Sequence, residues 1–230
     1  MKIRGVIFDV DGVLLDSMPT WHDAGARFLK RLGIEAEEGL GDRLFQETSV
    51  SGAEYMIRQY DLDLTVSEVA DGINSEMEAF YAHEADFKPG ARELIATLEE
   101  EQIPMTVATS TDRIYIETVL KRLGVFDLFK GVFCCTDYQT TKSERKIFDL
   151  ASGLMGTEPE ETWLFEDGLY SIRTAKNAGY RTVGVYDRIS ERDQADIRTL
   201  ADYYVRDLRD IRVGSGEITA LTEGAARRDG

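Results

Sequence analysis

After residue 90, short apolar runs alternate regularly with amphipathic segments, and this alternation restricts the fold more than any other feature of the chain. The apolar runs have the composition of buried strands, and the segments between them carry apolar residues at helical spacing. The sequence therefore predicts an α/β fold with a doubly wound parallel sheet, whose ligands bind at the carboxyl ends of its strands. The predicted strands are 105–108, 131–135, 162–165, 181–185 and 203–205, and the predicted helices are 90–101, 112–123, 143–155, 169–178 and a shorter one from residue 191.

Another apolar run, residues 6–8, leads directly into Asp9, Val10, Asp11 and Gly12. We interpret it as a buried strand that delivers two carboxylates to its carboxyl end. Side chains alternate along a strand, so Asp9 and Asp11 share one side if the extended backbone continues past residue 8. Two buried carboxylates at this spacing repel each other, and the site is therefore expected to hold a cation, for which Mg²⁺ is well suited.

Between these two regions, residues 18–84 contain no strand-like run. Apolar residues recur at helical spacing up to Gly33, again in 53–60, and again in 66–81, where Ser67 is the expected capping residue. Pro89 and Gly90 mark the return to the alternating pattern. We therefore predict an inserted helical domain at 17–85 and a core domain built from 1–16 and 86–230.

Residues suited to phosphate chemistry stand at or beside the ends of the other predicted strands. Hydroxyl groups and backbone N–H groups at the start of a helix can bind an anion, although Ser and Thr there also serve simply as helix caps. A lysine supplies a compact positive charge, and acidic residues can hold a metal ion. These residues are Thr109, Ser110 and Thr111 after one strand, Lys142 before a helix, and Glu166 and Asp167 after another strand.

Four of these segments resemble, in order, the four signatures of the haloacid dehalogenase superfamily. Residues 9–17 (DVDGVLLDS) match the pattern D-x-D-G-x-[LIV]-x-D-[ST], and 105–111 (MTVATST) resemble the second signature. Residues 142–148 (KSERKIF) keep the lysine and the aromatic residue of the third signature but lack its two prolines, and 162–168 (TWLFEDG) match the fourth. The resemblance covers the core from residue 1 to about residue 211. It points to the beta-phosphoglucomutase-like subgroup, in which the helical insert is a mobile cap.

This resemblance implies a role for each of the two leading aspartates. Asp9 would be the nucleophile that forms an aspartyl-phosphate, and Asp11 would be the general acid and base. Because halide departure needs no proton, Asp11 favours phosphate esters over haloacids as substrates.

The resemblance also assigns the phosphate-binding and metal-binding groups. Thr109, Ser110 and Lys142 would bind the transferring phosphoryl group, with Thr109 and Lys142 counted among the catalytic residues. Mg²⁺ would be held by Asp9, by the main chain of Asp11 and by Asp167, and Glu166 would either orient a metal-bound water or bind the metal directly.

The implied function is a Mg²⁺-dependent phosphatase that acts on a small phosphorylated metabolite such as a sugar phosphate. One alternative is a phosphomutase like beta-phosphoglucomutase, but residues 59–87 contain no Lys or Arg for a distal phosphate, and Trp21 stands where the mutase pattern has His. A second alternative is a non-catalytic regulatory protein that binds a phosphorylated metabolite.

The substrate-facing wall of the insert has four candidate residues, which are Met18, Trp21, His22 and Arg43. Ordinary helix packing or surface position explains each of them equally well.

The charge balance restricts the partners. The chain has 43 acidic and 27 basic residues and a formal net charge of −16, which argues against nucleic acid or an anionic membrane as the main partner. No apolar run is long enough to span a bilayer, and Asp9 and Asp11 interrupt the region that a signal peptide would need, so we expect a cytoplasmic monomer.

Cys134 and Cys135 are expected to be buried structural thiols. The residues after Ile211 are expected to be peripheral or mobile.

Overall fold

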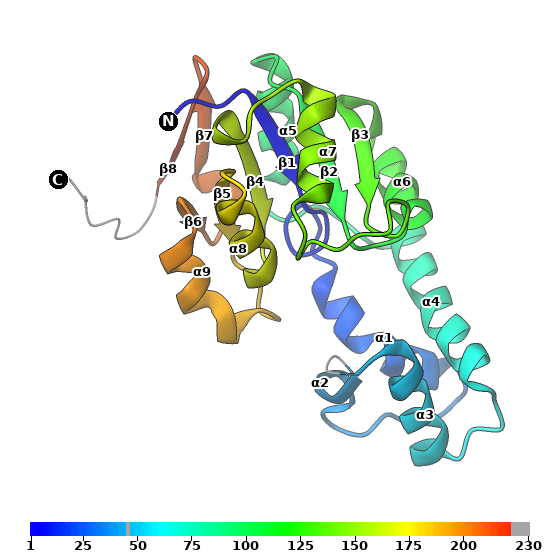
Figure 1. The fold of residues 1–230 in the computed structure, drawn as a ribbon. Helices are drawn as coiled ribbons and strands as arrows, with labels where there is room; N and C mark the ends of the chain where they lie inside the picture. The colour runs from blue at the N-terminus through cyan, green and yellow to red at the C-terminus, as the bar shows by residue number, and fades with distance from the viewer. Residues whose placement is uncertain (45–46, 222–230) are drawn as a thin grey trace. The chain divides into compact units, whose positions relative to one another are not determined.

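A computed structural model describes residues 1–44 and 47–221, which fall into two structural units (Figure 1). The first unit combines Met1–Asp16 with Asp86–Gly230, and the second unit is Ser17–Ala85. The backbone N–H of Asp16 donates a hydrogen bond to the carbonyl of Asp86 over 3.2 Å. The chain therefore leaves the first unit and returns to it at a single point. Within the described residues, no helix combines the length and the apolarity needed to cross a bilayer.

The centre of the first unit is a parallel sheet with the strand order β3-β2-β1-β4-β5-β6. Every residue of β1, β2 and β4 is buried, as expected for parallel strands that are covered on both faces. This arrangement confirms the predicted doubly wound fold. The strands are β1 (Gly5–Phe8), β2 (Met105–Thr109), β3 (Phe129–Cys134), β4 (Thr162–Glu166), β5 (Arg181–Val185) and β6 (Tyr203–Val205).

Helices cover both faces of this sheet (Figure 1). Because βαβ crossovers are right-handed, the helices that lead into β2 and β3 lie on one face, and those that follow β3, β4 and β5 lie on the other. The direction of winding reverses at β1, so the carboxyl end of β1 is the topological switch point where such sheets bind ligands. The helices are α5 (Ala91–Glu100) and α6 (Arg113–Arg122) on the first face, and α7 (Lys146–Met155), α8 (Leu169–Asn177) and α9 (Gln194–Leu200) on the second.

All the regular secondary structure in the described residues of the second unit is helical, and the unit has its own apolar core. Its helices are α1 (Met18–Arg31), α2 (Leu40–Leu44), α3 (Ser49–Tyr60) and α4 (Val66–His83). Phe28, Met56 and Val69, from α1, α3 and α4, belong to this core. The predicted cap of α4 was wrong by two residues: Thr65 is the capping residue, because its hydroxyl accepts the N–H of Glu68 while the Glu68 carboxylate accepts the N–H of Thr65.

The segment after Ile211 was expected to be peripheral or mobile, and for its described part this expectation was wrong. It forms an antiparallel hairpin of β7 (Ile211–Gly214) and β8 (Glu217–Ala220). Ile218 is fully buried, its N–H donates to the carbonyl of Met1 over 2.8 Å, and the N–H of Ile3 donates to the carbonyl of Gly216 over 3.0 Å. The hairpin therefore holds the start of the chain, whereas 222–230 lie outside the described residues.

The two adjacent cysteines lie at the end of β3 and in the residue that follows it. Cys134 and Cys135 are both buried and form no disulfide, which agrees with their predicted structural role.

Candidate active site

The two leading aspartates are buried at the carboxyl end of β1, with exposed fractions of 6% for Asp9 and 8% for Asp11. The backbone of Asp9 still pairs with β4, since its N–H donates to the carbonyl of Phe165 over 3.0 Å. The chain then turns sharply, because the carbonyl of Val10 accepts the N–H groups of residues 14 and 15. Gly12 has φ +76°, a left-handed conformation that glycine adopts without steric cost. This turn keeps both carboxyl groups at the switch point of the sheet.

Lys142 connects two of the acidic residues. Its Nζ lies 2.6 Å from Asp9 Oδ1 and 2.7 Å from Glu166 Oε1, and all three side chains are buried. Burial alone would lower the pKa of Lys142, but the neighbouring carboxylates outweigh this effect and raise the pKa. Lys142 is therefore a permanent positive charge inside the site. Lys146, four residues further along the chain, is exposed and instead donates to the backbone carbonyl of Tyr138 over 2.7 Å.

The pKa values of the buried carboxyl groups are shifted in different directions. Burial raises the pKa of Asp9 to about 7 against the opposing effect of Lys142, and the charges of Glu166 and Asp11 raise it further. Burial also raises the pKa of Asp167, and Glu166 and Asp9 add to this rise. Burial would raise the pKa of Glu166 too, but its ion pair with Lys142 and its hydrogen bond from the N–H of Gly168 outweigh burial and lower the pKa. The site thus holds more acidic groups than its lysine can neutralise.

The residues present fit a divalent cation. Asp9, Glu166 and Asp167 each offer a carboxylate oxygen, and these oxygens all lie within 4.8 Å of one another. Hard oxygen donors of this kind suit Mg²⁺, and a bound cation would offset the excess negative charge. The side chain of Asp11 is held differently, since the hydroxyl of Thr111 donates to its Oδ2 over 2.7 Å.

The threonine and serine residues after β2 form a turn that precedes α6. Thr109 is buried, and its Oγ1 accepts the N–H of Thr111 over 3.1 Å. Ser110 is exposed. The helix starts only at Arg113, with Asp112 as its N-cap residue, so these N–H groups are not in the first turn of the helix as the sequence suggested. One of them, the N–H of Thr111, is engaged inside the turn.

Sequence reasoning missed Tyr170, at the start of α8. Tyr170 is half-exposed, but partial burial and then the charge of Glu166 raise its pKa to about 12, against the opposing effect of a hydrogen bond with Ser110. A side chain at Gly168 would crowd both the Tyr170 ring, at 3.1 Å, and the Glu166 carboxylate, at 3.3 Å. The absence of a side chain at Gly168 thus lets the Tyr170 ring lie against the site. Its position two residues beyond the fourth signature was the only signal in the sequence.

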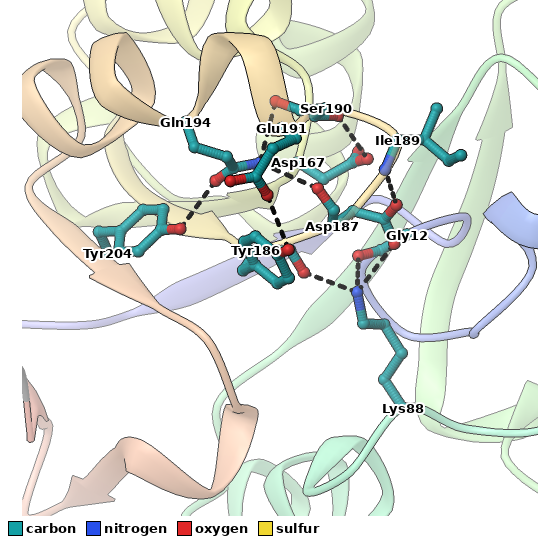
Figure 2. Close-up of polar contacts among 10 residues, drawn as sticks. All are labelled: Gly12, Lys88, Asp167, Tyr186, Asp187, Ile189, Ser190, Glu191, Gln194 and Tyr204. Atoms are coloured by element: carbon teal, nitrogen blue, oxygen red, sulfur yellow. Dashed lines mark hydrogen bonds and ion pairs between the residues drawn. The ribbon is translucent and has the colours of Figure 1, made fainter. Parts of the chain in front are cut away.

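A second polar cluster adjoins Asp167 (Figure 2). The hydroxyl of Ser190 donates to Asp167 Oδ2 over 3.4 Å, and Asp187 and Lys88 form a buried ion pair of 3.0 Å close by. None of these three residues stood out in the sequence, because each lies in a polar connecting segment with no recognisable spacing.

Three of the four candidates for a substrate-facing wall are engaged inside the second unit. The indole N–H of Trp21 donates to the hydroxyl of Tyr81 over 2.8 Å, and His22 lies between two aspartates. Arg43 pairs with Glu47 at 3.2 Å. Met18 is half-buried at the first position of α1.

Comparison with known proteins identifies the family. The family model of the haloacid dehalogenase-like hydrolases matches residues 6–185, which include every catalytic, phosphate-binding and metal-binding residue that the sequence predicted. The chain therefore belongs to the haloacid dehalogenase-like hydrolase family.

Curated relatives are named phosphatases. The chain is 27% identical over 210 residues to validoxylamine A 7'-phosphate phosphatase of Streptomyces hygroscopicus subsp. limoneus, covering 90% of this chain and 94% of the relative. It is 24% identical over 190 residues to a phosphorylated carbohydrates phosphatase of Thermotoga maritima, covering 82% and 88% of the two chains.

Solved structures share the fold. A Thermotoga maritima protein provisionally identified as a beta-phosphoglucomutase superposes with a TM-score of 0.78 at 23% identity, covering 90% of this chain and 96% of that chain. CbbY from Rhodobacter sphaeroides in complex with phosphate gives a TM-score of 0.72 at 22% identity, covering 90% and 95%. At these identities the likeness supports the fold, not a particular substrate.

Proposed function

We propose that this protein is a Mg²⁺-dependent phosphatase that hydrolyses a small phosphorylated metabolite, such as a sugar phosphate, through an aspartyl-phosphate on Asp9. The observation that carries the proposal is the buried contact of 2.6 Å between Asp9 and Lys142, beside the carboxylates of Glu166 and Asp167. The relatives named as a phosphorylated carbohydrates phosphatase and as a validoxylamine A 7'-phosphate phosphatase support the substrate class.

Asp9 is the proposed nucleophile. One of its carboxylate oxygens attacks phosphorus, and the bond between phosphorus and the ester oxygen breaks. Lys142 holds the carboxylate in place and offsets its charge as the phosphoryl group approaches. Covalent catalysis of this kind divides one difficult displacement into two easier ones.

Asp11 is the proposed general acid and base. It gives a proton to the departing alkoxide, and then takes a proton from the water that attacks the aspartyl-phosphate, which releases inorganic phosphate and restores Asp9. Proton transfer from a positioned group contributes about 10² to 10⁴ in rate. The hydrogen bond from Thr111 fixes the orientation of the Asp11 carboxyl group for both transfers.

Asp9 and Asp167 would hold the Mg²⁺ ion together with the main chain of Asp11, and Glu166 lies within reach of the same ion. When bound, the ion supplies positive charge that stabilises the ionised carboxylates and the phosphoryl oxygens. Thr109, Ser110 and Lys142 are the proposed phosphate-binding groups.

We propose that the second unit acts as the cap that its family resemblance implies. Its closure would exclude bulk water, which would otherwise weaken the electrostatic interactions inside the site.

A panel of phosphorylated metabolites, assayed for released phosphate with and without Mg²⁺, tests the function. Wild-type protein should release phosphate only with Mg²⁺, and Asp9→Asn should abolish turnover while circular dichroism shows an unchanged fold, because the amide is a poor nucleophile. Turnover retained by Asp9→Asn would rule out the covalent mechanism. Phosphorus NMR with a hexose 1-phosphate provides the second control: a 6-phosphate that appears faster than inorganic phosphate would identify a phosphomutase instead.

A further inference from the structure

Lys88 binds two segments of the first unit that are distant from it in sequence (Figure 2). Its Nζ donates to the carbonyl oxygens of Gly12 and Tyr186, each over 2.8 Å, and to Asp187 Oδ2 over 3.0 Å. The side chain of Lys88 is 12% exposed and that of Asp187 is 4% exposed. An ammonium group has three N–H donors, and here three oxygens accept them. Because every N–H donor of the ammonium group has an acceptor, both the charge and the direction of the hydrogen bonds fix the position of the Lys88 side chain.

One of these bonds acts on the turn that carries Asp11. Gly12 directly follows Asp11, and the backbone N–H of Lys88 also donates to the carbonyl of Leu14 over 2.8 Å. Lys88 therefore binds the turn twice, once through its ammonium group and once through its backbone. Movement of this turn would shift the Asp11 carboxyl group.

The other two bonds act on the loop after β5, which reaches the proposed metal ligand Asp167. Asp187 Oδ1 accepts the N–H of Ile189 over 2.9 Å, and Gln194 Nε2 donates to the carbonyls of Asp187 and Ser190 over 3.1 and 3.3 Å. This network shapes the loop so that the Ser190 hydroxyl contacts the Asp167 carboxylate. Lys88 thus joins the loop beside Asp167 to the turn beside Asp11.

We propose that Lys88 is a positioning residue for the reaction: together with Asp187 it fixes the turn of Asp11 and the loop of Ser190 relative to each other. The inference rests on the proposed function, since it assigns Asp11 and Asp167 their roles. Lys88 touches neither of these carboxylates in the described contacts and acts through Gly12, Tyr186 and Asp187. Groups that orient metal ligands in this way are worth about 10- to 100-fold in metal affinity or activity.

The test uses the double variant Lys88→Met/Asp187→Asn in the full chain. Lys88→Met alone would leave Asp187 as a buried, uncompensated carboxylate and could unfold the protein for that reason alone. The double variant removes both charges and keeps similar side-chain shapes, so the fold is retained while the hydrogen bonds to Gly12 and Tyr186 are lost. Lys176→Met is the control, because Lys176 forms a 2.8 Å pair with Asp202 elsewhere in the same unit and Asp202 keeps a second ion pair with Arg181 at 3.1 Å.

The first readout is hydrogen–deuterium exchange of the metal-free protein, which needs no enzymatic activity. Exchange at 10–15 and 187–190 should be faster in the double variant and unchanged in Lys176→Met. The second readout is Mg²⁺-dependent hydrolysis of p-nitrophenyl phosphate. In the double variant kcat should fall about 10- to 100-fold and more Mg²⁺ should be needed, while KM stays close to the wild-type value. Lys88→Arg, which keeps the charge beside Asp187, should recover part of kcat.

Wild-type exchange at both segments and wild-type kcat in the double variant would overturn the proposal and leave Lys88 as a counter-charge only. Absence of phosphatase activity in both the wild-type protein and Lys176→Met would instead overturn the proposed function. The exchange result would still show whether Lys88 fixes the two segments.

Discussion

The central residue of the candidate site is a lysine that two buried carboxylates share. Removing an ammonium group from water is costly, and Lys142 is retained in its buried position because Asp9 and Glu166 lie 2.6 and 2.7 Å from its Nζ. The residues around Lys142 lack the prolines of the third family signature, so they gave little indication that this lysine is buried in the site. Only its place in order with the other signatures pointed to Lys142.

Lys142→Met and Lys146→Met form a matched pair of substitutions four residues apart. Lys142→Met leaves Asp9 and Glu166 buried without their counter-charge, so it should abolish turnover and lower the free energy of unfolding by about 3–5 kcal/mol. Lys146 is exposed, so its substitution should change the free energy of unfolding by no more than about 0.5 kcal/mol. Urea denaturation and phosphate release measure the two effects. Equal effects of the two substitutions would show that Lys142 has no special role.

The raised pKa of Asp9 predicts how Mg²⁺ and pH act together. In the metal-free protein folded Asp9 keeps its proton to about pH 7, whereas the unfolded chain loses it near pH 3.8. The folded state therefore binds more protons in this window, and the Asp9 contribution to stability falls as pH rises from 3.8 to about 7 and changes no further above it. The raised pKa of Asp167 acts in the same direction, and Glu166, with its lowered pKa, is already ionised there.

Because Mg²⁺ binds the ionised carboxylates, its stabilising effect should grow as pH rises through that window. Differential scanning fluorimetry with and without Mg²⁺, from about pH 5 to about pH 8, measures this shift. The Asp9→Asn variant is the control, and its Mg²⁺-induced shift should be smaller and depend less on pH. A shift in the wild-type protein that is independent of pH would contradict the assignment of Asp9 as a ligand.

At the scale of secondary structure, the strands were predictable and the connections were not. Strands β1, β2 and β4 are buried on both faces, so their sequences are continuous apolar runs that stand out from their surroundings. The partners of Lys88 lie 76, 98 and 99 residues away from it, and nothing in its own segment indicates them. Tyr170 was missed for the same reason, because its contact with Ser110 joins segments at the ends of two different strands.

The hairpin of β7 and β8 should contribute measurably to the stability of the first unit. Ending the chain after Asp210 removes Ile211 and Ile218, whose burial is worth about 1.5–3 kcal/mol each, and the backbone bonds to Met1 and Ile3. The melting temperature should fall clearly. Ending the chain after Leu221 retains every described contact of the hairpin and is the control. Equal melting temperatures of the two truncated chains would show that the hairpin is dispensable.

At the scale of the whole molecule, the chain consists of two units joined by two adjacent segments. The segments 15–17 and 86–90 are therefore the candidate hinges for a movement of the second unit. Part of these segments is bound to the first unit, since Leu15 pairs with Phe87 and Lys88 holds the Gly12 turn. We therefore place the proposed movement of the second unit at 16–17 and 85–86.

Closure of the second unit should follow binding of a phosphoryl mimic. Small-angle scattering should show a smaller radius of gyration when Mg²⁺, beryllium fluoride and a substrate analogue are added together. Fluorescence of Trp21 in a Trp163→Phe background is the second measurement. Asp9→Asn, which cannot accept the mimic, should show neither change. A wild-type protein that shows no response in either measurement would have a rigid cap and a preformed cleft.

The central place of β1 in the sheet has a consequence for biosynthesis. Residues 5–8 are synthesised before both of their partners in the sheet, which are 105–107 on one side and 162–165 on the other. The nascent chain therefore carries an apolar strand with at least one unpaired edge until 162–165 have been made, and such edges are prone to aggregation. The helical segment 17–85, whose contacts are local, can form in the meantime. Completion of the sheet, and with it of the site around Asp9, depends on the slow closure of these long-range pairings.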